Sequence, residues 1–440
     1  MAPRGLTFTG LFASVMVALK LKENMDNYSK VATEEDGRVA LSAPPSYPVN
    51  YQDAEGQNSE GIRLLDTEIG VPRPTRRKTG CCVCCGMDCT LFWKALGIVI
   101  AILAVWNAVK LILWAVTPTP TGLEHMPVFS TSLGCVDAEY IYSAQPTTFQ
   151  VPMGLNNDHG MDVRGGCVGT ILLLEGAPTS TKIKYDLTLR ASDKKLLDEV
   201  ILEHAPDQDG AIKDSHMLLV TAHPTANACI RYDMRIFVPP TLKKLRVGAH
   251  ALTHVQFDPN SFIHLEDFFV TLYTPHSTNM IIPHNNIRAN NMALEVFQGW
   301  IVGDVALDGA TKVTTQRGAG IMNIRVHPAS AEDPATPEAV SLRTTSGSGR
   351  SDIFYVDHEH VHRPMSNVHM SSMNADMYLT YKDANYRGRL ELSSKSYTAT
   401  NLQRFDSDDT EDKKWTHWYG DQQGKDEISI KSRGWVGVYF

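Results

Sequence analysis

Five cysteines stand within nine residues, directly before a long apolar run, and they offer the first chemistry of this chain of 440 residues. They are Cys81, Cys82, Cys84, Cys85 and Cys89. Thiols that meet the lipid headgroups behind a basic cluster are open to reversible S-palmitoylation. A structural zinc site usually joins two separated ligand pairs, and no second Cys or His pair lies nearby. We therefore expect palmitoylation of these cysteines, with unmodified thiols and a metal site as the alternatives.

A histidine-rich segment, 357–370, reads DHEHVHRPMSNVHM and is a second candidate for metal chemistry. On a strand, His358, His360 and His362 would point to the same face, with neighbours about 6.5–7 Å apart. That spacing is too wide for all three to share one zinc ion without bending the chain. A polar outer face or loop is the simpler interpretation, and a metal site is the weaker alternative. We expect no other cofactor.

Aromatic side chains follow an acidic run near the C-terminus, at Trp415, Trp418 and Tyr419. Aromatic faces on a loop can stack on sugars or clamp a protein partner. The acidic run lacks the ligand spacing of a calcium-binding EF-hand. These three residues are therefore a candidate ligand loop for a carbohydrate or a protein. The alternative is a solvated charge run with its aromatic rings folded back on the domain.

The sequence lacks the common catalytic and nucleic-acid-binding motifs. No P-loop, no G-x-S-x-G elbow and no H-E-x-x-H motif occurs, so we predict a protein without catalytic activity and keep an unrecognised enzyme as an alternative. The net charge is −8. Apart from the basic cluster directly before the apolar run, the sequence has no basic patch interleaved with aromatic residues. Nucleic acid is therefore not an expected partner.

Three cysteines follow the apolar run, at Cys135, Cys167 and Cys229. In an oxidising compartment two of them can pair while the third is buried. We take Cys135 and Cys167 as the pair, and the other pairings stay open.

A short motif in the N-terminal part consists of Pro44, Pro45 and Tyr47 in the pattern P-P-x-Y. Two prolines pre-set a polyproline-II segment, and the aromatic grooves of WW domains bind such segments. The motif resembles the ligands through which ubiquitin ligases with HECT and WW domains find membrane cargo or adaptors. A chance match of four residues is the alternative.

The apolar run, residues 95–116, is interrupted only by Asn107 and Lys110. About 20 residues suffice to cross a bilayer as a helix, so we predict one membrane span. The cationic residues before it are Arg73, Arg76, Arg77, Lys78 and Lys94, whereas no Lys or Arg follows Val116 until Arg164. This asymmetry places the N-terminal flank in the cytoplasm and the rest of the chain outside. We expect a single-pass protein of the plasma membrane or the endomembrane system.

The segments around the span differ in composition. Residues 1–24 combine Arg4 with an apolar stretch, which fits a signal peptide, a second weak membrane segment, or an extension upstream of a start at Met25. Residues 25–94 are poor in large apolar side chains, so we expect a disordered cytosolic tail that contains the P-P-x-Y motif. Residues 117–125 form a proline-containing linker.

The region after the linker favours strands, because alternating segments recur and helical periodicity is nearly absent. We predict a β-sandwich-like part over 126–240. Residues 241–440 contain a repeat of an alternating strand followed by a turn. Its first copies are Met292, Leu294, Val296 with Gly299; Thr311, Val313, Thr315 with Gly318; Val340, Leu342, Thr344 with Gly347; and Val368, Met370, Ser372 with Ala375. The copies lie about 19 to 38 residues apart, as in stacked solenoid coils with loop insertions; an ordinary antiparallel sheet is the alternative.

Three stretches carry a resemblance to a known family: TKVTTQRGAGIMNIRV, AVSLRTTSGSGRSDIFYV and DEISIKSRGWVGVYF. They resemble the adhesin-like β-solenoid domain of unknown function that occurs in bacterial envelope proteins and, behind a single span, in uncharacterised fungal membrane proteins. The resemblance covers residues 242–440 and the layout of tail and span. It implies an all-β exoplasmic region, β-sandwich-like and then β-solenoid or β-helix-like, behind one transmembrane helix and a disordered tail. It also implies a non-catalytic binding or adhesion-like function and brings no catalytic residues; an adaptor that recruits a WW-domain ligase is the alternative.

Overall fold

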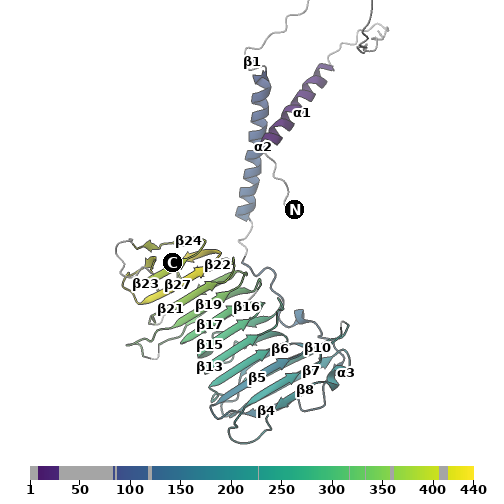
Figure 1. Ribbon diagram of the computed structural model, residues 1–440, viewed down its shortest axis with the longest axis vertical. Helices are drawn as coiled ribbons and strands as arrows, with labels where there is room; N and C mark the ends of the chain where they lie inside the picture. Colours follow the sequence, from purple (N-terminus) through teal and green to yellow (C-terminus); the bar gives the residue numbers. More distant parts are fainter. Residues whose placement is uncertain are drawn as a thin grey trace, which may run out of the picture. The chain divides into compact units, whose positions relative to one another are not determined.

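The computed structural model describes two compact units, Met1–Thr119 and Pro120–Phe440 (Figure 1). The described residues are 8–28, 83–84, 87–116, 121–225, 227–316, 318–331, 333–356, 361–405 and 415–440. The P-P-x-Y residues Pro44, Pro45 and Tyr47 lie outside these ranges, as do Cys81, Cys82 and Cys85.

The first unit contains two helices, α1 (Phe8–Tyr28) and α2 (Cys89–Val116), and a short antiparallel pair, β1 (Val83–Cys84) and β2 (Met87–Asp88). Phe12 of α1 meets Phe92 of α2 edge to face, with ring centroids 5.4 Å apart. α1 contains most of the apolar stretch of residues 1–24. Cys84 ends β1 and Cys89 begins α2, so both precede the apolar part of the helix.

Helix α2 is long and apolar enough to cross a membrane over Phe92–Ile112, which is 21 residues, or about 31 Å of helix. Only 11% of its most apolar window is buried. The core helix of a soluble protein would be mostly buried, so α2 is a candidate membrane span and does not have the burial of a core helix. The helix lies over most of the predicted span, 95–116.

The second unit is built almost entirely of strands, which form two 13-stranded sheets. The first sheet has the order β24 (Ser396–Thr400), β28 (Trp435–Tyr439), β22 (Met377–Thr380), β20 (Ser351–Tyr355), β18 (Ile321–Pro328), β16 (Trp300–Leu307), β14 (Met280–Ile282), β12 (Leu252–Phe257), β6 (Val168–Glu175), β10 (Ile230–Val238), β7 (Lys182–Ala191) and β3 (Tyr140–Ile141), with β4 (Thr148–Pro152) also on β7. The second sheet has the order β25 (Gln403–Arg404), β26 (His417–Tyr419), β23 (Gly388–Ser393), β27 (Asp426–Ser432), β21 (Ser366–Ser371), β19 (Ser341–Ser346), β17 (Ala310–Thr315), β15 (Ile287–Val296), β13 (Ile263–Leu272), β11 (Lys244–Ala249), β5 (Asp158–Arg164), β9 (His216–Val220) and β8 (Ile201–His204). The described residues of this unit also form two single turns of helix, η1 (Thr131–Leu133) and α3 (Lys195–Asp198). The all-β prediction for this region is confirmed.

The chain passes from one sheet to the other at every step through the middle of this unit. From β11 to β20, each strand pairs in parallel with the strand two positions further along the chain. Figure 1 shows the strands lying side by side as a stack. An ordinary antiparallel sheet is therefore wrong for this segment. Both sheets also continue across residue 240, because β6 pairs with β12 and β5 with β11.

The core lies between the two sheets, where every second side chain of a strand is buried. β7 reads KIKYDLTLRA and alternates half-buried and buried positions along its whole length. In parallel strands of this kind, aliphatic residues stack on their counterparts: Leu294 lies beside Val313, which lies beside Thr344. The opposite face of each sheet carries the residues that meet solvent.

Candidate functional site

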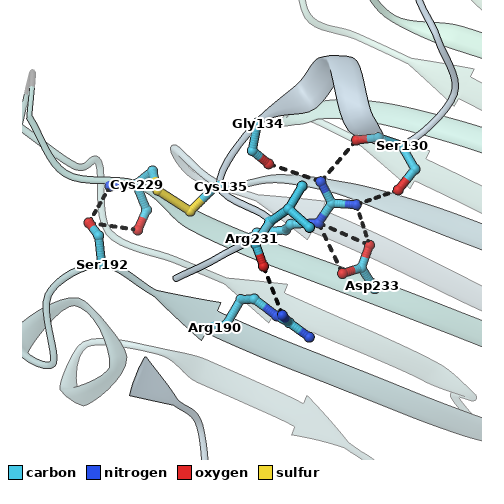
Figure 2. Close-up of a disulfide and its surroundings, with 9 residues drawn as sticks. Ser130, Gly134, Cys135, Arg190, Ser192, Cys229, Arg231 and Asp233 are labelled. Atoms are coloured by element: carbon cyan, nitrogen blue, oxygen red, sulfur yellow. Dashed lines mark hydrogen bonds and ion pairs between the residues drawn. A yellow bond between two sulfur atoms is a disulfide. The ribbon is translucent and has the colours of Figure 1, made fainter. Parts of the chain in front are cut away.

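The structure pairs Cys135 with Cys229, 94 residues apart, and leaves Cys167 as a free thiol. Figure 2 shows this disulfide beside the start of β10. The predicted pairing of Cys135 with Cys167 is therefore wrong. Cys167 precedes β6 with its side chain in the core, 1% exposed, and burial raises the pKa of its thiol to about 11. Cys229 instead stands just before β10, where the loop after η1 brings Cys135.

The histidine segment is only partly within the described ranges, because His358 and His360 lie outside them. His362 is half-buried, and its Nε2 lies 2.9 Å from a carboxylate oxygen of Asp426. Asp426 also accepts hydrogen bonds from the backbone N–H groups of Met365 and Arg387. Within the part of the chain that the structure describes, no three His, Cys, Asp or Glu side chains are placed to hold a metal ion.

The three aromatic residues of the predicted ligand loop differ in exposure. Trp415 is buried, 7% exposed, with the Arg389 guanidinium 5.1 Å above its ring. Tyr419 stacks on Phe440 at 4.7 Å, and Trp418 is half-buried on β26. Trp415 therefore has no free face for a ligand, which corrects the prediction for that residue. The rings fold back onto the domain because their apolar area is better buried than solvated.

A groove lies elsewhere, on the solvent face of the second sheet where β9, β5, β11 and β13 run side by side. It consists of two adjoining hollows of 430 Å³ and 330 Å³ that share Gly160, His216 and Arg246. The register places Gly160 between His216 and Arg246, and Asp162 of the next outward row beside Gly248. Gly160 carries no side chain, so the floor of the groove is bare backbone at this position, whereas Gly248 is buried beside the side chains of Asp162 and Tyr273.

Four of the eight Asp, Lys and Arg side chains that line the groove form ion pairs with one another. Arg164 contacts the Asp162 carboxylate at 2.6 Å, and Lys244 contacts Asp267 at 3.1 Å. Hydrogen bonds from Asn291 and Lys244 lower the pKa of Asp267, and the bond to Asp267 raises the pKa of Lys244. The pair of Lys244 and Asp267 therefore stays ionised at neutral pH.

Arg246 lines both hollows, and it is one of the charged groove residues that form no ion pair with a described residue. Its side chain is exposed, and its guanidinium lies 5.9 Å above the ring of Phe269. No acidic side chain in the described ranges forms an ion pair with it. A guanidinium has five N–H donors, so Arg246 offers the groove an open anchor for an acceptor.

One end of the groove is flat and aromatic. The rings of His250 and Tyr273 are stacked, with centroids 4.2 Å apart and an interplanar angle of 9°. Tyr273 is 47% exposed. Oδ1 of Asp162 has no hydrogen-bond partner and lies 3.8 Å from Nε2 of His250. The groove thus combines a hydrogen-bonding side chain with a flat aromatic surface, and both features are typical of ligand-binding sites.

Comparisons with known proteins add little to this geometry. No protein-family model and no curated protein matches the chain. Among solved structures, the chain is similar to a candidate cell adhesion protein from Clostridium sporogenes, at 9% identity and a TM-score of 0.21, over 67% of this chain and 99% of that chain. A likeness with so low a score carries no argument about the function of this chain.

Proposed function

We propose that this chain is a single-pass membrane protein that presents a non-catalytic, adhesion-like binding domain outside the cytoplasm. The observation that carries the proposal is α2, whose 21-residue apolar stretch is almost unburied. The cationic residues before α2 favour a cytoplasmic N-terminal flank. The disulfide between Cys135 and Cys229 supports the same direction, since disulfides persist in oxidising compartments.

The fold that fits this role best is a two-sheet β-solenoid. Its support is the parallel pairing of alternate strands from β11 onward, which is how successive coils of a solenoid stack on each other. A solenoid presents long, regular faces to solvent. The groove over β9, β5, β11 and β13 lies on such a face and is where we place ligand binding.

The proposals for the cytosolic tail rest on its sequence. They are palmitoylation of the juxtamembrane cysteines and binding of a WW-domain ubiquitin ligase at the P-P-x-Y motif of Pro44, Pro45 and Tyr47. Both are compatible with a membrane protein whose abundance is controlled from the cytosolic side.

A tag at the C-terminus should be protected from protease in sealed microsomes that contain the full chain. The protection follows if α2 crosses the membrane with its cationic flank in the cytoplasm. Immunoblotting with and without detergent measures it, and a tag before α2 is the matched control that should be digested in sealed vesicles. Digestion of the C-terminal tag without detergent would contradict the proposal.

A further inference from the structure

We propose that the groove over β9, β5, β11 and β13 binds an acidic saccharide, with Arg246 holding a sugar carboxylate and the Tyr273–His250 stack contacting a sugar ring. The inference names the ligand class for the binding domain proposed above and rests on that function. It is carried by an unpaired guanidinium, a floor without a side chain at Gly160 and an exposed aromatic face in one hollow.

The unpaired cation between the two hollows favours an acidic group. The lining carries four acidic side chains, Asp158, Asp162, Asp214 and Asp267, and four cationic ones, Arg164, Lys213, Lys244 and Arg246, so its formal charges balance. Asp162 and Asp267 are paired with Arg164 and Lys244, whereas Arg246, which both hollows share, forms no ion pair within the described residues. Arg246 is held over Phe269 with its donors open. A guanidinium binds a planar carboxylate through two parallel hydrogen bonds, and such charge-assisted pairs are stronger than neutral hydrogen bonds.

The backbone of the groove floor argues against an extended peptide as the ligand. β5 is hydrogen-bonded to β9 and to β11, and β11 is hydrogen-bonded to β5 and to β13. No free strand edge is therefore open here for a peptide to join the sheet. Recognition has to come from side chains, which suits a ligand that is rich in hydroxyl groups.

The aromatic end and the length of the groove complete the argument. A pyranose ring has an apolar C–H face that packs on a flat aromatic surface, and its hydroxyl groups point outward to polar partners such as His216. Arg246 lies on β11 and His250 directly follows its last residue, so the two are four residues apart, or about 13 Å of extended chain. The groove is thus long enough for more than one sugar ring, so an oligosaccharide is a better match than a single sugar.

The test uses the detergent-solubilised full chain and matched pairs of acidic and neutral sugars. The probes are oligogalacturonate and sialyllactose, each compared with its own methyl ester, which keeps the sugar rings and removes the negative charge. We expect at least one acidic probe to bind, and its neutral partner to bind about tenfold more weakly or worse. Calorimetry or biolayer interferometry measures the dissociation constants.

Two variants with matched controls locate the binding. Arg246→Ala should weaken binding of the acidic probe about tenfold or more, whereas Arg343→Ala, at an outward arginine on β19, should not. Gly160→Ile should fill the groove, because the nearest atom to an added Cβ is 4.0 Å away and the strand accepts the side chain. Ala293→Ile, on β15 beyond the groove, is its control.

Each outcome decides something. Equal binding of acidic and neutral probes, lost in Gly160→Ile, would overturn the acidic class while the groove remained the binding site. Binding that survives Gly160→Ile would overturn the groove. Failure of every saccharide probe, with protease protection of the C-terminal tag intact, would overturn the ligand class and leave the membrane-protein proposal standing.

Discussion

Acidification from pH 6.5 towards pH 4 should steeply destabilise the β unit, by up to about 4 kcal/mol per pH unit at the steepest point. The cause is three histidines whose imidazoles are buried in the neutral form. Burial lowers the pKa of His159 to about 3, that of His369 to about 3 and that of His254 to about 4. Each contributes at most about 1.4 kcal/mol per pH unit, and the three windows overlap.

His159 and His369 occupy equivalent environments between the two sheets. Nδ1 of His159 lies 2.7 Å from Oγ of Ser215, and its Nε2 lies 2.5 Å from the hydroxyl of Tyr185. The Ser215 hydroxyl donates to the backbone carbonyl of Pro152, so it accepts from His159 Nδ1–H, and Tyr185 donates to Nε2. A neutral imidazole therefore satisfies every partner.

The second histidine repeats this pattern. Nδ1 of His369 lies 2.7 Å from Oγ1 of Thr344, and its Nε2 lies 2.6 Å from the hydroxyl of Tyr381. His369 is on β21 of the second sheet, whereas Tyr381 follows β22 of the first, so the imidazole links the two sheets. A proton added here would put an uncompensated charge into the core.

The sign follows from where each state binds its protons. In the unfolded chain the imidazoles titrate near pH 6.5, but in the folded unit they stay neutral down to pH 4 or 3. Between these limits the unfolded state binds more protons, so the free energy of unfolding falls as the pH falls. Above pH 6.5 both states are neutral and this contribution is constant.

Guanidinium unfolding of the solubilised full chain at several pH values measures this dependence. His369→Gln should be less stable at neutral pH, and its slope between pH 4 and 6 should be shallower by about 1.4 kcal/mol per pH unit. His276→Gln, at an exposed histidine, is the control and should leave the slope unchanged. A stability that stays flat from pH 7 to pH 4 would contradict the prediction.

The buried histidines also show a part of the fold that the sequence does not predict, namely which side chains of a strand face the core. Alternation correctly predicts strands such as residues 182–191, because each apolar position there faces the core. The same reasoning assigns Val368 and Met370 to the core side of the next repeat, yet the buried positions of β21 are Asn367, His369 and Ser371. Their polar groups are satisfied inside, for example by Tyr355 and Tyr381 around Asn367, so hydrophobicity does not report the register.

The disulfide and the groove could not be predicted from the sequence for a different reason. Cys135 and Cys229 meet only because η1 packs on the start of β10, a contact between segments almost a hundred residues apart. The groove combines residues from Asp158 to Tyr273 on neighbouring strands, and no linear motif connects them. Its only local sign is Gly160 in a strand interior, which by itself is equally compatible with a bulge.

Replacing Arg231 by alanine should destabilise the β unit by about 3 kcal/mol, because a buried guanidinium with every donor used would be lost. Arg231 is 2% exposed and lies beside the disulfide, as Figure 2 shows. Nη1 donates to the carbonyls of Ser130 and Gly134, each at 2.9 Å, and Nη2 donates to Oγ of Ser130 at 2.6 Å. Nε and Nη2 also bind the Asp233 carboxylate.

The same segment is held a second time by the Cys135–Cys229 bond, which closes a loop of 94 residues and contributes up to about 4.6 kcal/mol by chain entropy. Arg231 and the disulfide both attach the same segment to β10. The losses of unfolding free energy in Arg231→Ala and Cys229→Ser should therefore not be additive. Guanidinium midpoints of the single and double variants measure the coupling, with Arg343→Ala as the surface control within about 0.5 kcal/mol of the parent.

Arg231→Lys should recover little of the stability lost in Arg231→Ala. An ammonium has three donors, so it cannot reach both carbonyls and the carboxylate in the planar geometry of a guanidinium. If Arg231→Ala unfolds at the same guanidinium concentration as the parent, Arg231 adds no stability to that given by the disulfide, and the prediction is wrong.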